Sequence, residues 1–330
     1  MHADIDFRVD QDRLVSAPCV VCGATAPVPA YPVRDPVIDG RFRWSFVLCG
    51  ECGHGYIDPR PDAELLDELY AKLFNDSTLD STVWSQTNGF DQGLQRARVA
   101  AIQSAVGQRP VERILDVGCG IGMTLEKLAK AFPGAECMGT EASPVMTKMA
   151  NEREGVHVTA EPFLQREVEP ASLDVLSMNH LLEHLFHPRV DLERAAEWVK
   201  PGGVIHIEVP QLEGWARKTF GRWWWCHLPP QHLQLFSESG LRKLLKETGF
   251  PEVVSVERTG YPANITVAWA LYIHMTFGKQ GLFRNHGWIR IPICIAACLP
   301  IPLTLLADLL INRPMNRRNG DILRIVARRA

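Results

Sequence analysis

The feature that most constrains this chain is a glycine-rich turn between an apolar segment and an amphipathic one. Residues 114–122 read ILDVGCGIG, and MTLEKLAKAF follows at once at residues 123–132. Glycine adopts backbone conformations that side chains exclude, and it lets a ligand approach the main chain closely. The first amides of the following helix have no partner within that helix. The pattern therefore predicts a strand, a ligand-binding turn and a helix.

The spacing of the glycines distinguishes between the known classes of nucleotide-binding turn. A dinucleotide-binding GxGxxG turn would need glycine at position 123, where Met123 stands. No phosphate loop ending in GKS or GKT occurs. What remains is a GxGxG turn with Asp116 two residues before its first glycine.

Segments on either side of this turn alternate between two periodicities. Short apolar runs such as RILDVG, CMGTEA, VHVTA, LDVLSMN and VIHIEVP are separated by stretches with helical spacing. This alternation predicts an α/β domain with a largely parallel sheet over residues 111–260. We expect a small cysteine-rich lobe over 1–60, a helical connector over 61–110, and an apolar helical insertion followed by a last strand over 261–330.

The ordered set of these motifs resembles the class I S-adenosylmethionine-dependent methyltransferases. DVGCGIG is similar to the first motif of that family, and LDVLSMNHLLEHLFHP and KPGGVIHIEVP are similar to its fourth and fifth strands. The resemblance covers about residues 100–260. It implies a Rossmann-like sheet with helices on both faces and S-adenosylmethionine as the bound cofactor.

The resemblance also implies which residues hold the cofactor. The glycine turn would hold the methionine part and the ribose, Glu141 the ribose hydroxyls, and Ala142 and Glu161 would lie near the adenine. Asn179 would lie beside the sulfonium. The complete set is Asp116, Gly118, Cys119, Gly120, Gly122, Glu141, Ala142, Glu161 and Asn179.

Two CxxC pairs near the start of the chain predict a metal site. Cys19 and Cys22 form one pair and Cys49 and Cys52 the other, each followed by glycine. Two intervening residues allow both thiolates of a pair to bind one tetrahedral ion, so four thiolates fit a structural Zn²⁺ in a zinc-ribbon-like lobe. An iron–sulfur site, a redox pair and unligated cysteines remain as alternatives.

Histidines supply the candidates for a general base, because their pKa is suited to proton transfer near neutral pH. His180 and His184 follow the fourth strand, and His232 follows the fifth. The chain also resembles sugar C-methyltransferases that have an N-terminal zinc lobe, and this resemblance implies His232 as the base, because those enzymes use a histidine at the matching position. This chain has Gln231 where those enzymes have an acid, which disfavours C-methylation and leaves O-methylation open.

The predicted activity is methyl transfer to a small-molecule acceptor, a sugar or a glycan or lipid-linked precursor like those of surface-polysaccharide clusters. An O-methyltransferase of a quinone-like or polyketide-like ring is the alternative. A tRNA or rRNA methyltransferase is disfavoured because the net charge is −3 and no basic stripe occurs.

The expected compartment is the cytoplasm, because the chain begins with a polar, acidic segment and has nine cysteines, an odd number. Residues 291–307 carry no charge but contain three prolines. They are read as a pocket wall or, with the arginines that follow, as a peripheral membrane contact through 288–318.

Overall fold

The computed structural model describes residues 9–34, 42–74, 89–161, 166–261, 263–277 and 300–330. These residues form two compact units that interleave along the chain. We call the first the lobe unit (Met1–Leu69, Pro210–Ser237 and Arg258–Leu323) and the second the sheet unit (Tyr70–Val209, Glu238–Glu257 and Arg324–Ala330). The predicted linear division into four segments stays a prediction.

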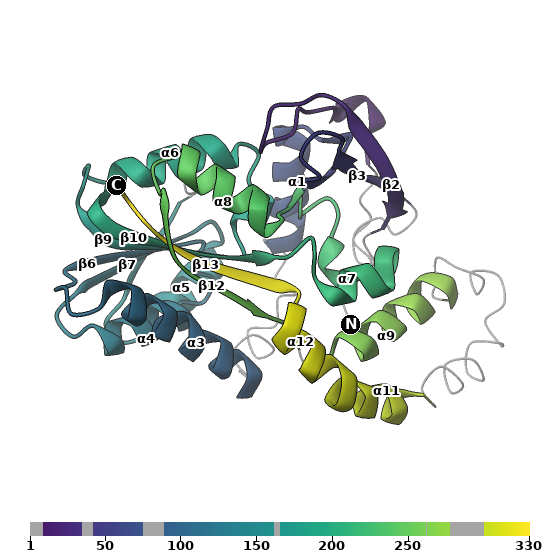
Figure 1. Ribbon diagram of the computed structural model, residues 1–330. Coiled ribbons are helices and arrows are strands. Elements are labelled where there is room, and N and C mark those ends of the chain that lie inside the picture. The colour runs from purple at the N-terminus through teal and green to yellow at the C-terminus, as the bar shows by residue number, and fades with distance from the viewer. Residues whose placement is uncertain (1–8, 35–41, 75–88, 162–165, 262, 278–299) are drawn as a thin grey trace. The chain divides into compact units, whose positions relative to one another are not determined.

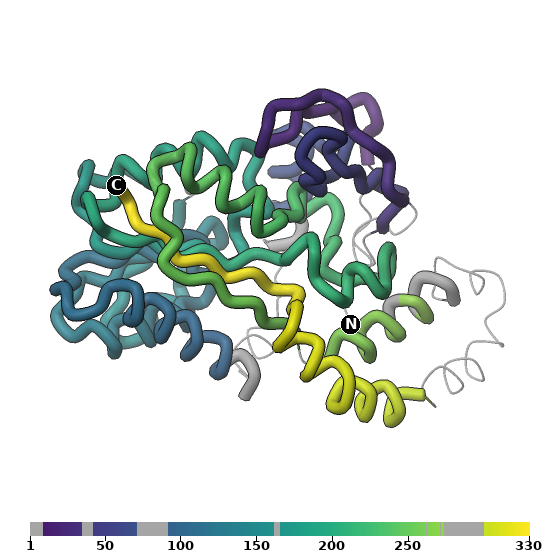
Figure 2. The backbone as a smooth tube through the Cα atoms, in the orientation of Figure 1, coloured from purple at the N-terminus to yellow at the C-terminus, as the bar shows by residue number. Residues whose placement is uncertain are grey.

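The sheet unit is built on a seven-stranded sheet, which confirms the predicted α/β class (Figure 1). Its strands lie in the order β12 (Glu252–Thr259), β13 (Ile322–Arg328), β10 (Val199–Pro210), β9 (Leu173–Asn179), β6 (Arg113–Val117), β7 (Glu136–Glu141) and β8 (His157–Ala160). All pairs from β10 through β8 are parallel. The C-terminal segment forms the predicted last strand and inserts between β12 and β10 (Figure 2).

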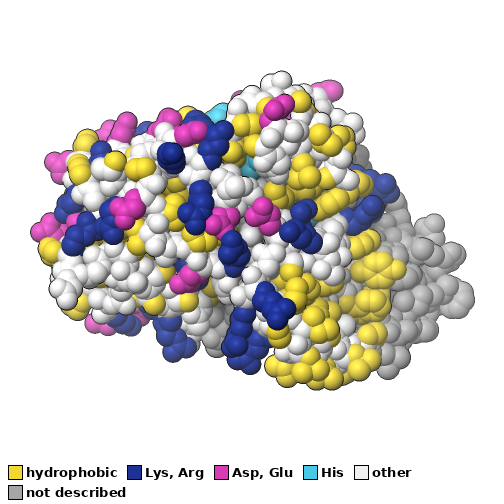
Figure 3. All heavy atoms as spheres, in the orientation of Figure 1, with side chains coloured by type: hydrophobic (Ala, Val, Ile, Leu, Met, Phe, Trp, Pro, Cys, Tyr) yellow, Lys and Arg dark blue, Asp and Glu magenta, His cyan; other side chains and the backbone are white. Residues whose placement is uncertain are grey.

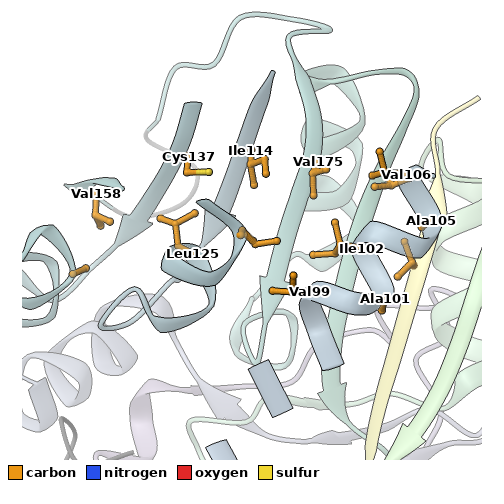
Figure 4. Close-up of a cluster of buried hydrophobic side chains, with 14 residues drawn as sticks. Val99, Ala101, Ile102, Ala105, Val106, Ile114, Leu125, Cys137, Val158 and Val175 are labelled. Carbon is orange, nitrogen blue, oxygen red and sulfur yellow. The ribbon is translucent and has the colours of Figure 1, made fainter. Parts of the chain in front are cut away.

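Helices cover both faces of this sheet (Figure 1). One face carries α3 (Gly89–Val106) and α4 (Met123–Ala131), and the other carries α6 (Pro188–Trp198) and α8 (Glu238–Glu247). α5 (Pro144–Asn151) joins β7 to β8. Ile102 of α3 and Leu125 of α4 are fully buried against Ile114 and Val175 of the strands (Figure 4). The apolar spacing of both helices is therefore explained by their packing on the sheet.

The strand order places β6, the first strand of the alternating pattern, in the interior of the sheet between β9 and β7. From β6 the chain adds β7 and β8 on one side and then returns to add β9 and β10 on the other. Ligands bind open α/β sheets at the carboxyl ends of the strands where the order reverses in this way. The turns after β6 and β9 therefore border the predicted binding crevice.

The lobe unit contains a four-stranded sheet ordered β11 (Gln234–Leu235), β4 (Gly55–Ile57), β3 (Trp44–Cys49) and β2 (Pro27–Val33). Its core is rich in aromatic residues, among them Trp44, Phe46, Trp215 and Trp224. Short elements complete it: η1 (Gln11–Arg13), β1 (Leu14–Val15), β5 (Arg60–Pro61), α7 (Trp215–Phe220), η4 (Gly221–Trp223) and η5 (Trp225–His227). Helix α1 (Ala63–Phe74) begins in this unit and ends in the sheet unit.

Three further helical elements follow in the lobe unit. They are α9 (Asn264–Phe277), α11 (Ile301–Ala307) and α12 (Arg313–Asn319), the last two joined by the π-helical turn η8 (Asp308–Asn312). Within the described ranges, none of the helices combines the length and the apolar character that a membrane span requires.

Candidate functional site

The predicted ligand-binding residues gather at one edge of the sheet. β6 ends at Val117 before the glycine turn, β7 ends at Glu141 and β9 ends at Asn179. The parallel register pairs Val117 with both Thr140 and Met178, so the three strands end at the same level. Side chains separated by more than sixty residues are thereby brought to one site.

The glycine turn has the backbone conformation that its sequence predicted. Gly118, Gly120 and Gly122 have φ values of 65°, 55° and 74°, in the left-handed region that favours glycine. A Cβ atom at Gly120 would meet nothing within 4 Å, whereas one at Gly118 would lie 3.1 Å from Leu181. The turn therefore presents open backbone at Gly120, where a ligand can approach the main chain.

Glu141 links the second strand to this turn. Its carboxylate accepts hydrogen bonds from the amides of Gly120 and Ser143, both at 2.9 Å. Burial raises the pKa of Glu141, and these backbone amides oppose the shift. A carboxylate has about four acceptor positions, so Glu141 retains capacity to accept bonds from a diol.

Asp116 and Asn179 form the polar centre of the site. The Asn179 amide donates to Asp116 Oδ1 at 3.1 Å and to Ser177 Oγ at 2.7 Å. Its Oδ1 atom is buried and accepts no hydrogen bond from any described residue. Burial raises the pKa of Asp116 to about 6. An unsatisfied amide oxygen beside a buried carboxylate favours a ligand that is cationic and donates hydrogen bonds.

The remaining predicted cofactor residues have distinct surroundings. Ala142 is exposed beside Glu141. The Cys119 amide donates to Thr140 O at 3.0 Å, which ties the turn to β7. The Glu161 carboxylate lies 2.5 Å from Thr159 Oγ1 and 3.1 Å from an Arg166 nitrogen. Glu161 therefore already forms an ion pair with Arg166, five residues further along the chain.

His180 is held in a cluster of charges. It has a φ of 53°, which is uncommon for a residue with a side chain. Its Nδ1 lies 3.2 Å from Glu183 and its Nε2 lies 3.2 Å from Glu208. Burial alone would lower the pKa of His180, but the hydrogen bonds to these carboxylates outweigh it and raise the pKa to about 9. A histidine that is protonated at neutral pH does not suit the predicted role of general base.

Two arginines complete this cluster, and the sequence did not reveal them. Arg98 of α3 donates to Glu208 Oε1 at 2.9 Å, and Arg324 of β13 donates to Oε2 at 2.7 and 3.0 Å. Glu208 is fully buried, and although burial opposes ionisation, the Arg98 charge and His180 hold its pKa well below the usual range. A glutamate inside the apolar run VIHIEVP was the available signal, because a buried charge requires a partner.

The two other candidate bases lie in different units. His184, in the sheet unit, places Nδ1 2.9 Å from the Tyr70 hydroxyl, a contact that the sequence did not predict. His232, in the lobe unit, is buried and has Nδ1 2.7 Å from the Cys226 carbonyl oxygen. A carbonyl oxygen can only accept, so Nδ1 of His232 carries the hydrogen and Nε2 carries the lone pair when the ring is neutral.

The four paired cysteines of the lobe unit converge on one point. Cys19 Sγ lies 3.6 Å from Cys52 Sγ, Cys22 Sγ lies 3.5 Å from Cys49 Sγ, and all four sulfur atoms lie within 4.8 Å of one another. A tetrahedral ion with bonds of about 2.3 Å would separate its sulfur ligands by roughly 3.8 Å. The geometry is thus compatible with one tetrahedral ion.

The neighbouring His54 does not compete for that position. It is fully buried, its Nε2 lies 2.9 Å from Gln234 Oε1, and burial lowers its pKa to about 4. The side chain is therefore neutral and engaged with β11.

Comparison with protein families gives a match that covers most of the sheet unit and part of the lobe unit. A family model described as a methyltransferase domain matches residues 90–256, just over half of the chain. A trans-aconitate 2-methyltransferase from Methylobacterium nodulans is 32% identical over 199 residues, which cover 59% of this chain and 74% of that protein.

Other relatives match shorter stretches. A trans-aconitate 2-methyltransferase from Deinococcus radiodurans is 34% identical over 110 residues, covering 33% of this chain and 42% of that protein. A ubiquinone biosynthesis O-methyltransferase from Maricaulis maris is 34% identical over 123 residues, which cover 34% of this chain and 47% of that protein. The chain thus spans about half the length of these two curated relatives.

A solved structure shares the fold at low sequence identity. The 4+2 cyclase SpnF superposes with a TM-score of 0.51 at 16% identity and covers 82% of this chain and 97% of that chain. The likeness concerns the fold alone, since one fold supports different reactions.

The charge on His180 predicts a pH-dependent stability. Its pKa is 6.5 in an unfolded chain and about 9 here, so the folded state binds the proton more tightly. The stabilisation is fully present below about pH 6.5 and is lost as the pH rises through about 9. By urea unfolding, we expect His180→Gln to be less stable than wild type by up to roughly 3 kcal/mol near pH 6, with the difference shrinking toward pH 9.

The exposed His157→Gln serves as the matched control and should show no such trend. A difference between wild type and His180→Gln that does not change with pH would mean that His180 is neutral in the folded protein.

Proposed function

Because this chain belongs to the methyltransferase-domain family, we propose that it transfers the methyl group of S-adenosylmethionine to a small-molecule acceptor. The observation that carries the proposal is the unsatisfied Asn179 oxygen beside Asp116, at the strand edge that also holds Gly120 and Glu141. Each of these protein groups suits one polar group of S-adenosylmethionine.

The fit follows from the chemistry of each group. The buried carboxylate of Asp116 and the Asn179 oxygen suit the α-ammonium group of the methionine part, which is a cation with three donors. Glu141 can accept hydrogen bonds from the two ribose hydroxyls while it keeps its bonds to Gly120 and Ser143. The exposed Ala142 follows Glu141 and leaves room for an adenine ring.

When bound, S-adenosylmethionine supplies a methyl group activated by a positively charged sulfur. The protein must then orient the acceptor along the sulfur–carbon axis and take up the proton that the acceptor loses. We assign proton uptake to His232, because its Nδ1–H bond to the Cys226 carbonyl leaves the lone pair on Nε2. His184 is the second candidate, with Tyr70 as its orienting partner.

His180 has a different role in this proposal. Its ring joins Glu183 to Glu208 and so holds the backbone just after Asn179. It would act on the bound cofactor only through the position of Asn179.

The acceptor that we propose is a sugar or a glycan or lipid-linked precursor. The proposal is supported by the order of the sequence motifs and by the pairing of a four-cysteine lobe with a methyltransferase sheet. Methylation of a quinone-like ring is the second candidate, favoured by a relative named as a ubiquinone biosynthesis O-methyltransferase. The net charge of −3 speaks against a nucleic-acid acceptor.

We further propose that Cys19, Cys22, Cys49 and Cys52 bind a structural zinc ion. The support is the convergence of their sulfur atoms, together with Gly23 and Gly53, whose φ values of 79° and 70° close the two tight turns. A closed set of four thiolates leaves no open position for a substrate. Its contribution would be to the stability of a lobe that has a small core.

The cofactor site is tested by calorimetry with S-adenosylmethionine. Asp116→Asn should weaken binding about tenfold to a hundredfold, because a charge-assisted hydrogen bond is lost. In wild type, affinity should fall as the pH drops through about 6, where Asp116 takes up a proton. That trend should vanish in Asp116→Asn and persist in the control Glu152→Gln, which lies on the surface. Unchanged affinity in Asp116→Asn would refute the site.

The base assignment is tested by methyl transfer to a panel of nucleotide-linked sugars, polyprenyl-linked sugars, quinone phenols and bulk tRNA. With the acceptor that is methylated, His232→Gln should lower turnover at least a hundredfold and leave the affinity for S-adenosylmethionine unchanged. Tyr70→Phe and His184→Gln should have smaller effects. If His232→Gln leaves turnover intact and His184→Gln abolishes it, the role of base belongs to His184.

The metal site is tested by elemental analysis of the purified protein. We expect about one zinc ion per chain, lost in the double variant Cys19→Ser and Cys49→Ser together with a lower melting temperature. The control Cys137→Ser removes a buried thiol of the sheet unit and should retain the zinc. Iron in place of zinc, or no metal in wild type, would contradict the assignment.

A further inference from the structure

The helical run from Ile301 to Asn319 in the lobe unit has an inverted polarity. It comprises α11, the π-helical turn η8 and α12. A helix of a water-soluble domain normally buries its apolar face and exposes its polar face. In this run the buried positions include Asp308, Asn312 and Asn316, while most of the leucines are exposed.

The buried polar residues are fully used for interactions inside the lobe unit. Asp308 accepts hydrogen bonds from the amides of Ile265 and Thr266 at 2.8 and 2.9 Å, and so caps the start of α9. Asn312 donates to the Tyr261 carbonyl at 2.8 Å. These interactions fix which side of the run faces the protein.

Asn316 extends the same polar stripe by one turn. Its amide donates to the Tyr261 carbonyl at 2.8 Å, and its oxygen accepts a hydrogen bond from Trp215 Nε1 at 2.7 Å. Residues 308, 312 and 316 therefore anchor one flank of the run by directional bonds, and the run cannot rotate to bury its leucines without breaking them.

The opposite flank is an apolar ridge of six side chains, each at least half exposed. Leu303 and Leu310 are the most exposed, at 70% and 63%. The leucine ridge consists of Leu303, Leu305, Leu306, Leu309, Leu310 and Ile311. Hydrophobic side chains gather over α11 on the surface shown in Figure 3. An exposed apolar patch of this kind marks an interaction site, because covering it removes apolar surface from water.

The charge next to the ridge is entirely positive. Arg313, Arg317 and Arg318 of α12 are exposed, and none forms an ion pair within the described ranges of the chain. Asp308 is the one acidic residue between positions 301 and 319, and it faces inward. The outer surface of the run therefore combines an apolar strip with three uncompensated guanidinium groups.

We propose that the leucine ridge inserts into the interfacial region of a lipid bilayer, with Arg313, Arg317 and Arg318 contacting anionic headgroups. An apolar strip bordered by basic residues is the composition that lies in the plane of such an interface. Positive charge without a neighbouring acid favours an anionic surface over a second copy of this chain, whose ridge would carry the same arginines.

This surface lies within the predicted contact region 288–318, of which residues 288–299 are outside the described residues. The inference concerns binding to lipid and stands apart from methyl transfer.

The experiment is sedimentation of the full chain with vesicles. Wild type should bind vesicles that contain phosphatidylglycerol in phosphatidylcholine at least tenfold more tightly than vesicles of phosphatidylcholine alone, and added salt should weaken the binding. The double variant Leu306→Asp and Leu310→Asp should lose binding at least tenfold, and the milder Leu306→Gln with Leu310→Gln should lose it in part. The control Val190→Asp changes an equally exposed apolar residue of α6 and should bind as wild type does.

Charge is tested separately with Arg317→Glu and Arg318→Glu. This variant should lose the preference for phosphatidylglycerol, whereas Arg96→Glu, an exposed arginine of α3, should keep it. Binding of S-adenosylmethionine should be unaffected in all these variants, so a failure of the lipid inference is distinguishable from a failure of the proposed activity.

Three outcomes would overturn the inference. The first is a wild type that sediments with neither vesicle, and the second is leucine variants that sediment as well as wild type does. A concentration-dependent dimer that the leucine variants abolish, with no vesicle binding, would assign the ridge to a second copy instead.

Discussion

The sheet unit depends on one fully buried carboxylate, that of Glu208. It accepts hydrogen bonds from Arg98 of α3 and Arg324 of β13, and it lies 3.2 Å from the ring of His180 after β9. Three elements far apart in sequence thus share one anion. Removing one partner of a buried ion pair destabilises a protein by about 3–5 kcal/mol, because the remaining charge is buried without a partner or solvating water. The cluster therefore fixes the mutual position of a helix, a strand and a turn.

This cluster connects packing to the candidate site through one residue. His180 is held in a left-handed conformation, its amide donates to the Glu208 carbonyl at 2.8 Å, and Asn179 precedes it directly. Strained conformations persist where the surroundings over-determine them. The position of the Asn179 amide, and with it the orientation of its unsatisfied oxygen, follows from this constraint. A buried charge network thereby sets the geometry at the strand edge.

The lobe unit uses buried polar groups differently. Hydrogen bonds to backbone groups and to an indole N–H are formed by Asp308, Asn312 and Asn316. These directional bonds determine the orientation of the helical run. The leucines of the same run then face outward. A helix oriented by hydrophobic burial would have been placed the other way round. The lobe therefore combines an aromatic core with an outer surface on which apolar side chains are exposed to solvent.

Local patterns in the sequence were sufficient to predict the alternating strands and helices and the conformation of the turn at Gly118 and Gly120. The resemblance to class I methyltransferases added the positions of Glu141 and Asn179 at strand ends. The locally predicted features depend on spacing and on backbone preferences, which act over a few residues. The partners Arg98, Arg324 and Tyr70, the protonated state of His180 and the outward direction of the leucines depended on the tertiary structure. They arise from contacts between residues more than forty positions apart in the sequence or from the burial of a charge, and no local pattern specifies either.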